Sequence, residues 1–291
     1  MAELETSLKR TDTGTIAPKN TSLLVGELEK ILLQEMPSED ACSWDRTGML
    51  VGNPLEVVRG VAIALDPTIP TIKAAKEAGA NVLVTHHPVF LEAPDSFVPD
   101  VIQGHTPGAV VRFACEQGIS IMSFHTALDV SIAGLAALPK LLRLKPIGVL
   151  EPLEKGSDKG FGQICEPTDG DAEQGISLRH LSARCVSVFE SLPRVWGSSD
   201  RVVNRIVTCG GSAGSLLQEC LDQGVECLIC GEAKYHEALD ASLSGLSIID
   251  VSEFPLCALL AAQVQAAGIA QNCISMIDQK NKWYTPESSR R

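Results

Sequence analysis

The sequence predicts an α/β protein, on three observations. Hydrophobic residues make up 45% of the 291 residues, which is enough for a substantial core in one large or two modest domains. Aromatic residues make up only 4%, which suits tightly packed layers of helices and sheets better than an aromatic-rich sandwich or barrel. Short β-branched runs also alternate with helical patterns along much of the chain, as expected for parallel strands joined by helices.

The elements of the first half follow this alternation. Residues 1–20 lack periodicity and are expected to form a flexible tail. An amphipathic helix is predicted between residues 21 and 37, where four aliphatic residues fall at helical spacing: Leu24, Leu28, Ile31 and Leu32. The elements that follow are a strand at 58–66, a helix at 68–80, a strand at 81–88, a helix at 108–118, a strand within 119–129 and a helix at 134–144.

The signal weakens between residues 146 and 200, where we expect the junction and the start of a second domain. Residues 150–175 are rich in Gly, Asp, Glu and Pro and are interpreted as loops around a short strand, followed by a helix at 177–189. The first domain would then span 21–145 and the second α/β domain 201–285. The predicted elements of the second half are strands at 205–211, 225–232 and 246–251 and helices at 215–224, 235–245 and 255–268.

Composition restricts the environment and the partners of the protein. A formal net charge of −12 argues against a broad nucleic-acid surface, because phosphate binding requires clustered Lys and Arg. No apolar run approaches the length of a membrane span, and the polar N-terminus does not resemble a signal peptide, so we expect a cytoplasmic protein. Most of the ten cysteines lie inside apolar segments, which is typical of reduced cysteines that pack in a core.

Histidines and carboxylates follow the predicted strands of the first half. Asp66 ends the strand at 58–66, His86 and His87 end the next strand, and His125 with Asp129 follows the third. Because parallel strands present their C-terminal ends on one edge of a sheet, these residues are expected to share that edge. A histidine pair alone is more often a packing or surface feature, but imidazoles combined with a carboxylate suit divalent Zn, Fe, Mn or Ni, as one or two ions.

Three further motifs have weaker functional readings. The segment "CGGSAGSLL" (209–217) could cradle an anion, although a tight turn is the simpler interpretation because P-loop and dinucleotide spacings are absent. Cys227 and Cys230 have the spacing of a redox or zinc pair, but apolar residues surround them and favour core packing. His236, near a predicted helix start, is equally compatible with a surface and a substrate-facing position. His105 and His180 are expected to be structural or solvated.

Six segments in order resemble the dinuclear-metal family of GTP cyclohydrolase I type 2 homologues, also called NIF-three-like proteins. They are "WDRTGMLVG", "VTHHPVF", "FHTALDV", "CGGSAGSLL", "GEAKYHEALDA" and "SEFP", and they extend the resemblance from about residue 22 to 278. The resemblance implies two similar α/β domains with central mixed sheets flanked by helices. It also implies a toroidal hexamer and two divalent ions at the junction of the domains.

Carried over by motif, the resemblance implies that His86 and His87 each approach one ion. Asp129 would coordinate the first ion, and Glu253 in "SEFP" would bridge both. His125 and Asp66 would line the cleft, with His125 and Glu253 as the expected catalytic residues. The sequence departs from the family at one point, because Ile249 occupies the position of a family histidine four residues before that glutamate. Either Asp250 replaces the missing ligand, or the alignment shifts so that Glu253 takes the place of the histidine and Cys257 that of the glutamate.

The sequence leaves three functions open. In the first, a divalent ion lowers the pKa of a bound water, and the protein is a metal-dependent hydrolase of unknown small-molecule substrate. In the second, the protein is a non-catalytic metal-binding oligomer that stores, delivers or senses ions or binds a partner; the missing histidine favours this reading. A thiol-redox role of Cys227 and Cys230 is a third and weaker alternative.

Overall fold

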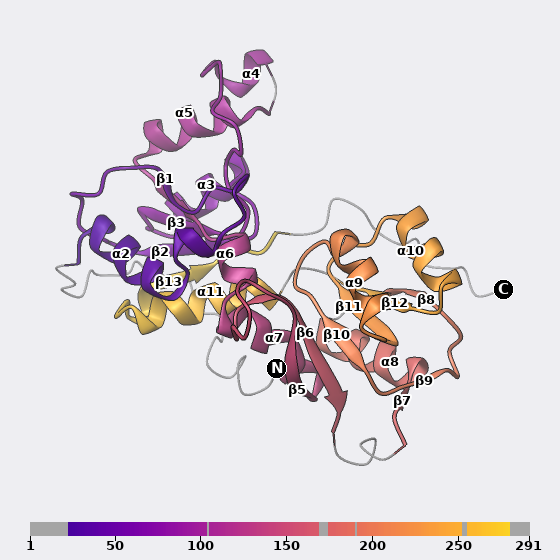
Figure 1. The fold of residues 1–291 in the computed structure, drawn as a ribbon. Helices are drawn as coiled ribbons and strands as arrows, with labels where there is room; N and C mark the ends of the chain where they lie inside the picture. Colours follow the sequence, from indigo (N-terminus) through magenta and orange to yellow (C-terminus); the bar gives the residue numbers. More distant parts are fainter. Residues whose placement is uncertain (1–22, 104, 169–173, 190, 252–254, 280–291) are drawn as a thin grey trace.

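Two mixed β-sheets flanked by helices form the framework of the computed structural model, so the predicted α/β fold is confirmed. The structure describes residues 23–103, 105–168, 174–189, 191–251 and 255–279. Figure 1 shows the two sheets side by side, with helices α6 (Thr126–Asp129) and α7 (Ile132–Leu142) between them. Within these ranges, no helix is both long and apolar enough to cross a membrane.

The first sheet has the strand order β1-β4-β3-β2-β13. Its strands are β1 (Gly48–Val51), β2 (Val61–Ala64), β3 (Val82–Thr85), β4 (Ser120–Ser123) and β13 (Ile274–Met276). All neighbouring pairs are parallel except β1 with β4. The C-terminal ends of β2, β3 and β4 therefore lie together on one edge of the sheet.

Helices cover both faces of this sheet because successive strand residues point to opposite sides. On one face, α2 (Val25–Glu35) and α11 (Pro255–Ala266) pack against Val61, Ile63, Val82 and Val84. On the other face, α3 (Ile69–Glu77) and α5 (Pro107–Gln117) pack against Ala62, Ala64, Leu83 and Ile121. The side chains of Thr68 and Thr106 accept hydrogen bonds from the first turns of α3 and α5 and so fix where these helices begin.

The second sheet has the strand order β5-β6-β10-β11-β12-β8. Its strands are β5 (Leu144–Pro152), β6 (Gly160–Pro167), β8 (Arg194–Trp196), β10 (Ile206–Thr208), β11 (Cys227–Cys230) and β12 (Ser247–Asp250). Helices α7 and α8 (Leu178–Phe189) cover one face, and α9 (Leu217–Asp222) and α10 (Tyr235–Leu243) cover the other. The short elements are η1 (Ser38–Asp40), α4 (Asp100–Gln103), β7 (Ile176–Ser177), β9 (Val202–Val203), η3 (Gly214–Leu216) and η4 (Gln271–Cys273).

Strand β6 is the short strand expected within residues 150–175, and β5, which the sequence pattern did not predict, pairs with it as a hairpin. Much of β5 is exposed on both sides, and the pairing is irregular between Pro146 and Gly148. An exposed edge strand of this kind carries no alternation of apolar and polar residues, so its sequence resembles a loop.

The last part of the chain returns to the first sheet. Strand β13 pairs in parallel with β2, and Leu256, Leu260 and Val264 of α11 belong to the core on the α2 face. The sequence pattern predicts these residues in the second domain, whereas their contacts are with the first sheet. The division into domains at 146–200 stays a prediction. The chain crosses between the two sheets twice, from α6 into α7 and again between β12 and α11.

Candidate metal centre

Three histidines meet at the C-terminal edge of the first sheet. His86 and His87 follow β3 directly, and His125 follows β4 after a single intervening residue. One ligand nitrogen from each of the three lies within 4.8 Å of those of the other two. His86 is fully buried, whereas His87 and His125 are partly exposed. The register of the parallel strands thus brings together the histidines whose clustering the sequence predicted.

An acceptor faces the Nδ1 atom of each histidine. The partners are the carbonyl oxygen of Phe124 for His86 at 3.1 Å, Asp66 Oδ1 for His87 at 2.7 Å and Asp45 Oδ1 for His125 at 3.2 Å. A histidine that donates its Nδ1–H to such an acceptor presents the lone pair of Nε2, in a fixed ring orientation. Oriented imidazoles of this kind are characteristic of protein metal sites.

The environment of His86 fits a cation. Its Nε2 atom is buried and has no hydrogen-bond partner among the described residues, and Asp129 Oδ1 lies 3.8 Å away. Burial holds the pKa of His86 well below its usual range, and the neighbouring His87 and His125 lower it further. The imidazole is therefore neutral, with a buried lone pair beside a carboxylate, and nitrogen and carboxylate donors together suit divalent Zn, Fe, Mn or Ni.

Asp45 also belongs to the site, although no sequence pattern pointed to it. Its side chain is completely buried and accepts hydrogen bonds from the backbone N–H and the hydroxyl of Thr126, at 2.9 and 2.5 Å. Burial alone would raise the pKa of Asp45, but the hydrogen bonds from His125, Thr126 and Arg46 outweigh it and hold the pKa well below its usual range. Asp45 is thus an ionised buried carboxylate that fixes His125.

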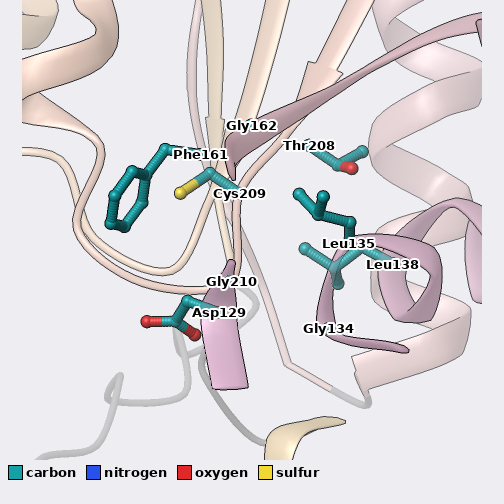
Figure 2. Close-up of a pocket in the computed structure, with 9 residues that line it drawn as sticks. All are labelled: Asp129, Gly134, Leu135, Leu138, Phe161, Gly162, Thr208, Cys209 and Gly210. Atoms are coloured by element: carbon teal, nitrogen blue, oxygen red, sulfur yellow. The ribbon is translucent and has the colours of Figure 1, made fainter. Parts of the chain in front are cut away.

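Asp129 lies where the second sheet meets the site. It lines a small cavity of about 10 Å³, close to the lower limit for one water, together with Phe161, Cys209 and Gly210 (Figure 2). A Cβ atom added to Gly210 would lie 3.4 Å from both Asp129 Oδ1 and Leu256 Cδ2. The glycine-rich turn after β10, expected to be a tight turn, thus brings the second sheet against the carboxylate of Asp129.

The remaining sequence candidates lie in other surroundings. Glu253 lies outside the described residues. Asp250, one of the two proposed replacements for the missing histidine, is engaged by the guanidinium of Arg194 and by the backbone N–H of Ala233. Cys257, the other replacement, is buried in the core of the first sheet, and Ile249 is buried in that of the second.

Other polar candidates show no link to the site. His236 is exposed on α10 beside the ring of Tyr235, and His105 and His180 are also exposed. Cys227 and Cys230 are buried in β11, as the core-packing interpretation predicted. Burial raises the pKa of both thiols, which opposes formation of the reactive thiolate.

Together, the fold and these contacts define an α/β protein with a candidate metal centre at the ends of parallel strands. Comparison with known proteins places the chain in a family: residues 23–279 match the Duf34/NIF3 (NGG1p interacting factor 3) family, and the protein belongs to it. A protein of Streptomyces coelicolor named GTP cyclohydrolase 1 type 2 homolog is 31% identical over 242 residues, which cover 78% of this chain and 81% of that protein.

Solved structures support the same fold. A Bacillus cereus protein related to NIF3 superposes with a TM-score of 0.80 at 17% sequence identity, covering 92% of this chain and 100% of that chain. Reduced HcgD from Methanocaldococcus jannaschii superposes with a TM-score of 0.72 at 22% identity, covering 90% of this chain and 100% of that chain. At these identities the likeness establishes the fold alone.

Proposed function

We propose that the protein is a metal-dependent hydrolase whose centre holds one or two divalent ions. The observation that carries this proposal is the group of three histidines with mutually close nitrogens, each oriented through Nδ1. His86, His87 and Asp129 are the proposed ligands, and the position of His125 makes it a further candidate. Glu253 is the proposed ligand from the second half of the chain. Leu256, three residues later, lies beside Gly210 at the Asp129 side of the site, which supports this assignment.

A divalent ion bound there would lower the pKa of a water molecule and polarise a carbonyl or phosphoryl group. The residues of the chain would supply the remaining functions. Asp45 and Asp66 hold the rings of His125 and His87 in fixed orientations. His125, whose side chain is partly exposed, and Glu253 are the two residues proposed to transfer protons.

The name GTP cyclohydrolase 1 type 2 homolog belongs to relatives, and the substrate of this chain is a separate question. By the family resemblance we also propose a toroidal hexamer, which the molar mass in solution by light scattering would test. A cytoplasmic location is proposed on the composition of the chain.

A non-catalytic metal-binding role is the second candidate function, favoured by one observation. Ile249, at the position of the family histidine, is buried among apolar side chains, and the neighbouring Asp250 is engaged by Arg194. The described residues 246–251 therefore offer no substitute ligand. A centre that lacks one ligand can bind a single ion and serve storage, delivery, sensing or partner binding.

Metal content per chain distinguishes the two functions. We would purify the protein without chelator and determine metals by elemental analysis for wild type, His87→Ala and Glu253→Ala, with the exposed His180→Ala as the matched control. Near two ions per chain, decreasing in both site variants, supports the hydrolase. About one ion, lost in His87→Ala and retained in Glu253→Ala, supports the binding role. Metal content unchanged in every variant would refute the proposed ligand set.

A further inference from the structure

A groove opens beside the candidate metal centre, between η1 and the tip of the β5–β6 hairpin. Its volume is about 460 Å³, within the range of roughly 300–1,000 Å³ that small-molecule sites occupy. Glu39 and Asp40 line it from η1, Cys42 from the following loop, and Glu154, Lys159 and Phe161 from the hairpin.

Contacts connect this groove to the centre on two sides. The backbone N–H of Cys42 donates to the hydroxyl of Thr126 at 3.0 Å, and Thr126 in turn donates to Asp45, the partner of His125. Phe161 lines the groove and also the small cavity beside Asp129, which Figure 2 shows. The groove and the cavity that Asp129 lines therefore share the side chain of Phe161.

The groove is acidic. Lys159 is its only basic lining residue and already forms an ion pair with Asp40, with 2.6 Å between Nζ and Oδ2. Glu39 and Glu154 are exposed and have no basic partner among the described residues. The four charged lining residues thus carry a net charge of −2. Lys155 and Asp158 of the hairpin loop lie outside the lining, and their charges cancel.

These charges decide which ligands the groove accepts. A positively charged nitrogen gains from the two unpaired carboxylates and from the ring of Phe161, whose face attracts cations. A nucleoside triphosphate would bring several negative charges into the same space and would be repelled. The charges of the lining residues alone thus disfavour a free polyphosphate in the groove.

We propose that this groove binds a small organic cation, and that this cation is the substrate class of the metal centre. The second part rests on the proposed function, whereas the charge preference of the groove is independent of it.

The thiol of Cys42 provides a reporter inside the groove, and Cys115, exposed on α5, provides an internal reference. The rate of modification at each cysteine would be followed by peptide mass spectrometry. The reagents are trimethylammonium-ethyl methanethiosulfonate, which is cationic, and sulfonatoethyl methanethiosulfonate, which is anionic. At each cysteine we would compare the ratio of the cationic to the anionic modification rate. Two net negative charges within about a Debye length of Cys42 should make this ratio about fivefold or more higher at Cys42 than at Cys115.

Variants test whether the lining carboxylates cause this preference. In the double variant Glu39→Gln/Glu154→Gln the ratio at Cys42 should fall severalfold towards that at Cys115. A remainder is expected because the charges of Asp45 and Asp129 also act on Cys42. Glu166→Gln is the matched control, because Glu166 lies on the same hairpin outside the groove lining, beside Lys145. Equal ratios at the two cysteines of the wild type, or a loss in the control as large as in the double variant, would overturn the proposal.

Ligand protection tests occupancy in the wild-type protein, without any variant. Benzamidine and benzoate have similar shapes and opposite charges, and each would be titrated against modification of Cys42 by neutral methyl methanethiosulfonate. Saturable protection by benzamidine, with none by benzoate or GTP and none at Cys115, is the expected result. Protection by GTP or benzoate in place of benzamidine would refute a cation site.

Both experiments would be run on metal-loaded and on chelator-treated protein, because thiol modification needs no metal. Cation protection in both forms, combined with metal content that does not depend on His87, would show that the groove binds cations while the proposed function fails. Absence of cation protection, combined with His87-dependent metal content, would refute the groove proposal and leave the metal centre intact.

Discussion

The two aspartates that orient site histidines should differ sharply in what they contribute to stability. Asp45 Oδ1 faces His125 Nδ1 and Asp66 Oδ1 faces His87 Nδ1, so the two pairs are chemically alike. The side chain of Asp45 is completely buried, whereas that of Asp66 is 45% exposed. Replacing each by asparagine removes the charge and preserves the size, which makes the two variants a matched pair.

The contacts set the expected magnitudes. Asp45 accepts three hydrogen bonds from Thr126 and His125, and in Asp45→Asn an amide nitrogen would face donors where a carboxylate oxygen accepted. Hydrogen bonds to a charged group contribute about 1.5–3 kcal/mol each, and an asparagine side chain retains some of them, so Asp45→Asn should cost about 2–4 kcal/mol of unfolding free energy. Asp66→Asn loses one exposed ion pair and should cost about 0–1 kcal/mol.

The assay separates folding from metal binding. Urea unfolding of chelator-treated protein, followed by circular dichroism, gives the stability of each variant without metal. Competition with a chelating dye then gives zinc affinity, which should fall about 10- to 100-fold in both variants because each aspartate orients a histidine that we propose as a ligand or candidate ligand. Equal stability losses in the two variants would refute the distinction by burial. Unchanged zinc affinity in both would refute the orienting role.

Three further outcomes follow from the packing. Gly134→Ala would drive its Cβ into the backbone carbonyl oxygen of Leu128 and should cost about 1–3 kcal/mol in thermal or urea unfolding, whereas Gly148→Ala, with open space around it, should leave stability unchanged. Cys227 and Cys230 should resist iodoacetamide in the native protein and react only in denaturant, as judged by intact mass. Ile249→His, which introduces the histidine that the family resemblance implies at this position, should destabilise the protein by about 2–4 kcal/mol without raising its metal content, since it places an imidazole in an apolar cluster.

The sequence predicted the histidines of the site because local patterns determine their positions. β-branched runs locate β2, β3 and β4, and the parallel register of these strands then brings His86, His87 and His125 together. Asp45 has no such signal. It precedes β1, lies 80 residues from His125 in the chain, and reaches it only because β1 pairs antiparallel with β4. Pairing between strands so far apart in sequence leaves no trace in local periodicity.

The assignment of α11 shows the same limit at the scale of whole elements. Its helical pattern was predictable, but the choice of sheet depends on which apolar face remains uncovered after the rest of the chain folds. Helices α7 and α8 already cover one face of the second sheet and α9 and α10 the other, while α2 alone leaves part of the first sheet open. Leu256, Leu260 and Val264 fill that space.

The two crossings of the chain explain why the candidate centre lies between the sheets. The first turn of α7 approaches the carbonyl of Leu128 so closely that only a glycine fits at position 134. This contact holds α7 against α6, and the second sheet packs on α7. Gly210 of the second sheet thereby reaches Asp129, and Leu256 of the returning helix reaches the same point. The geometry around Asp129 therefore depends on the packing of both halves, whereas His86, His87 and His125 are held by the first sheet alone. A shift between the halves should accordingly perturb the Asp129 side of the centre and leave the three histidines in place.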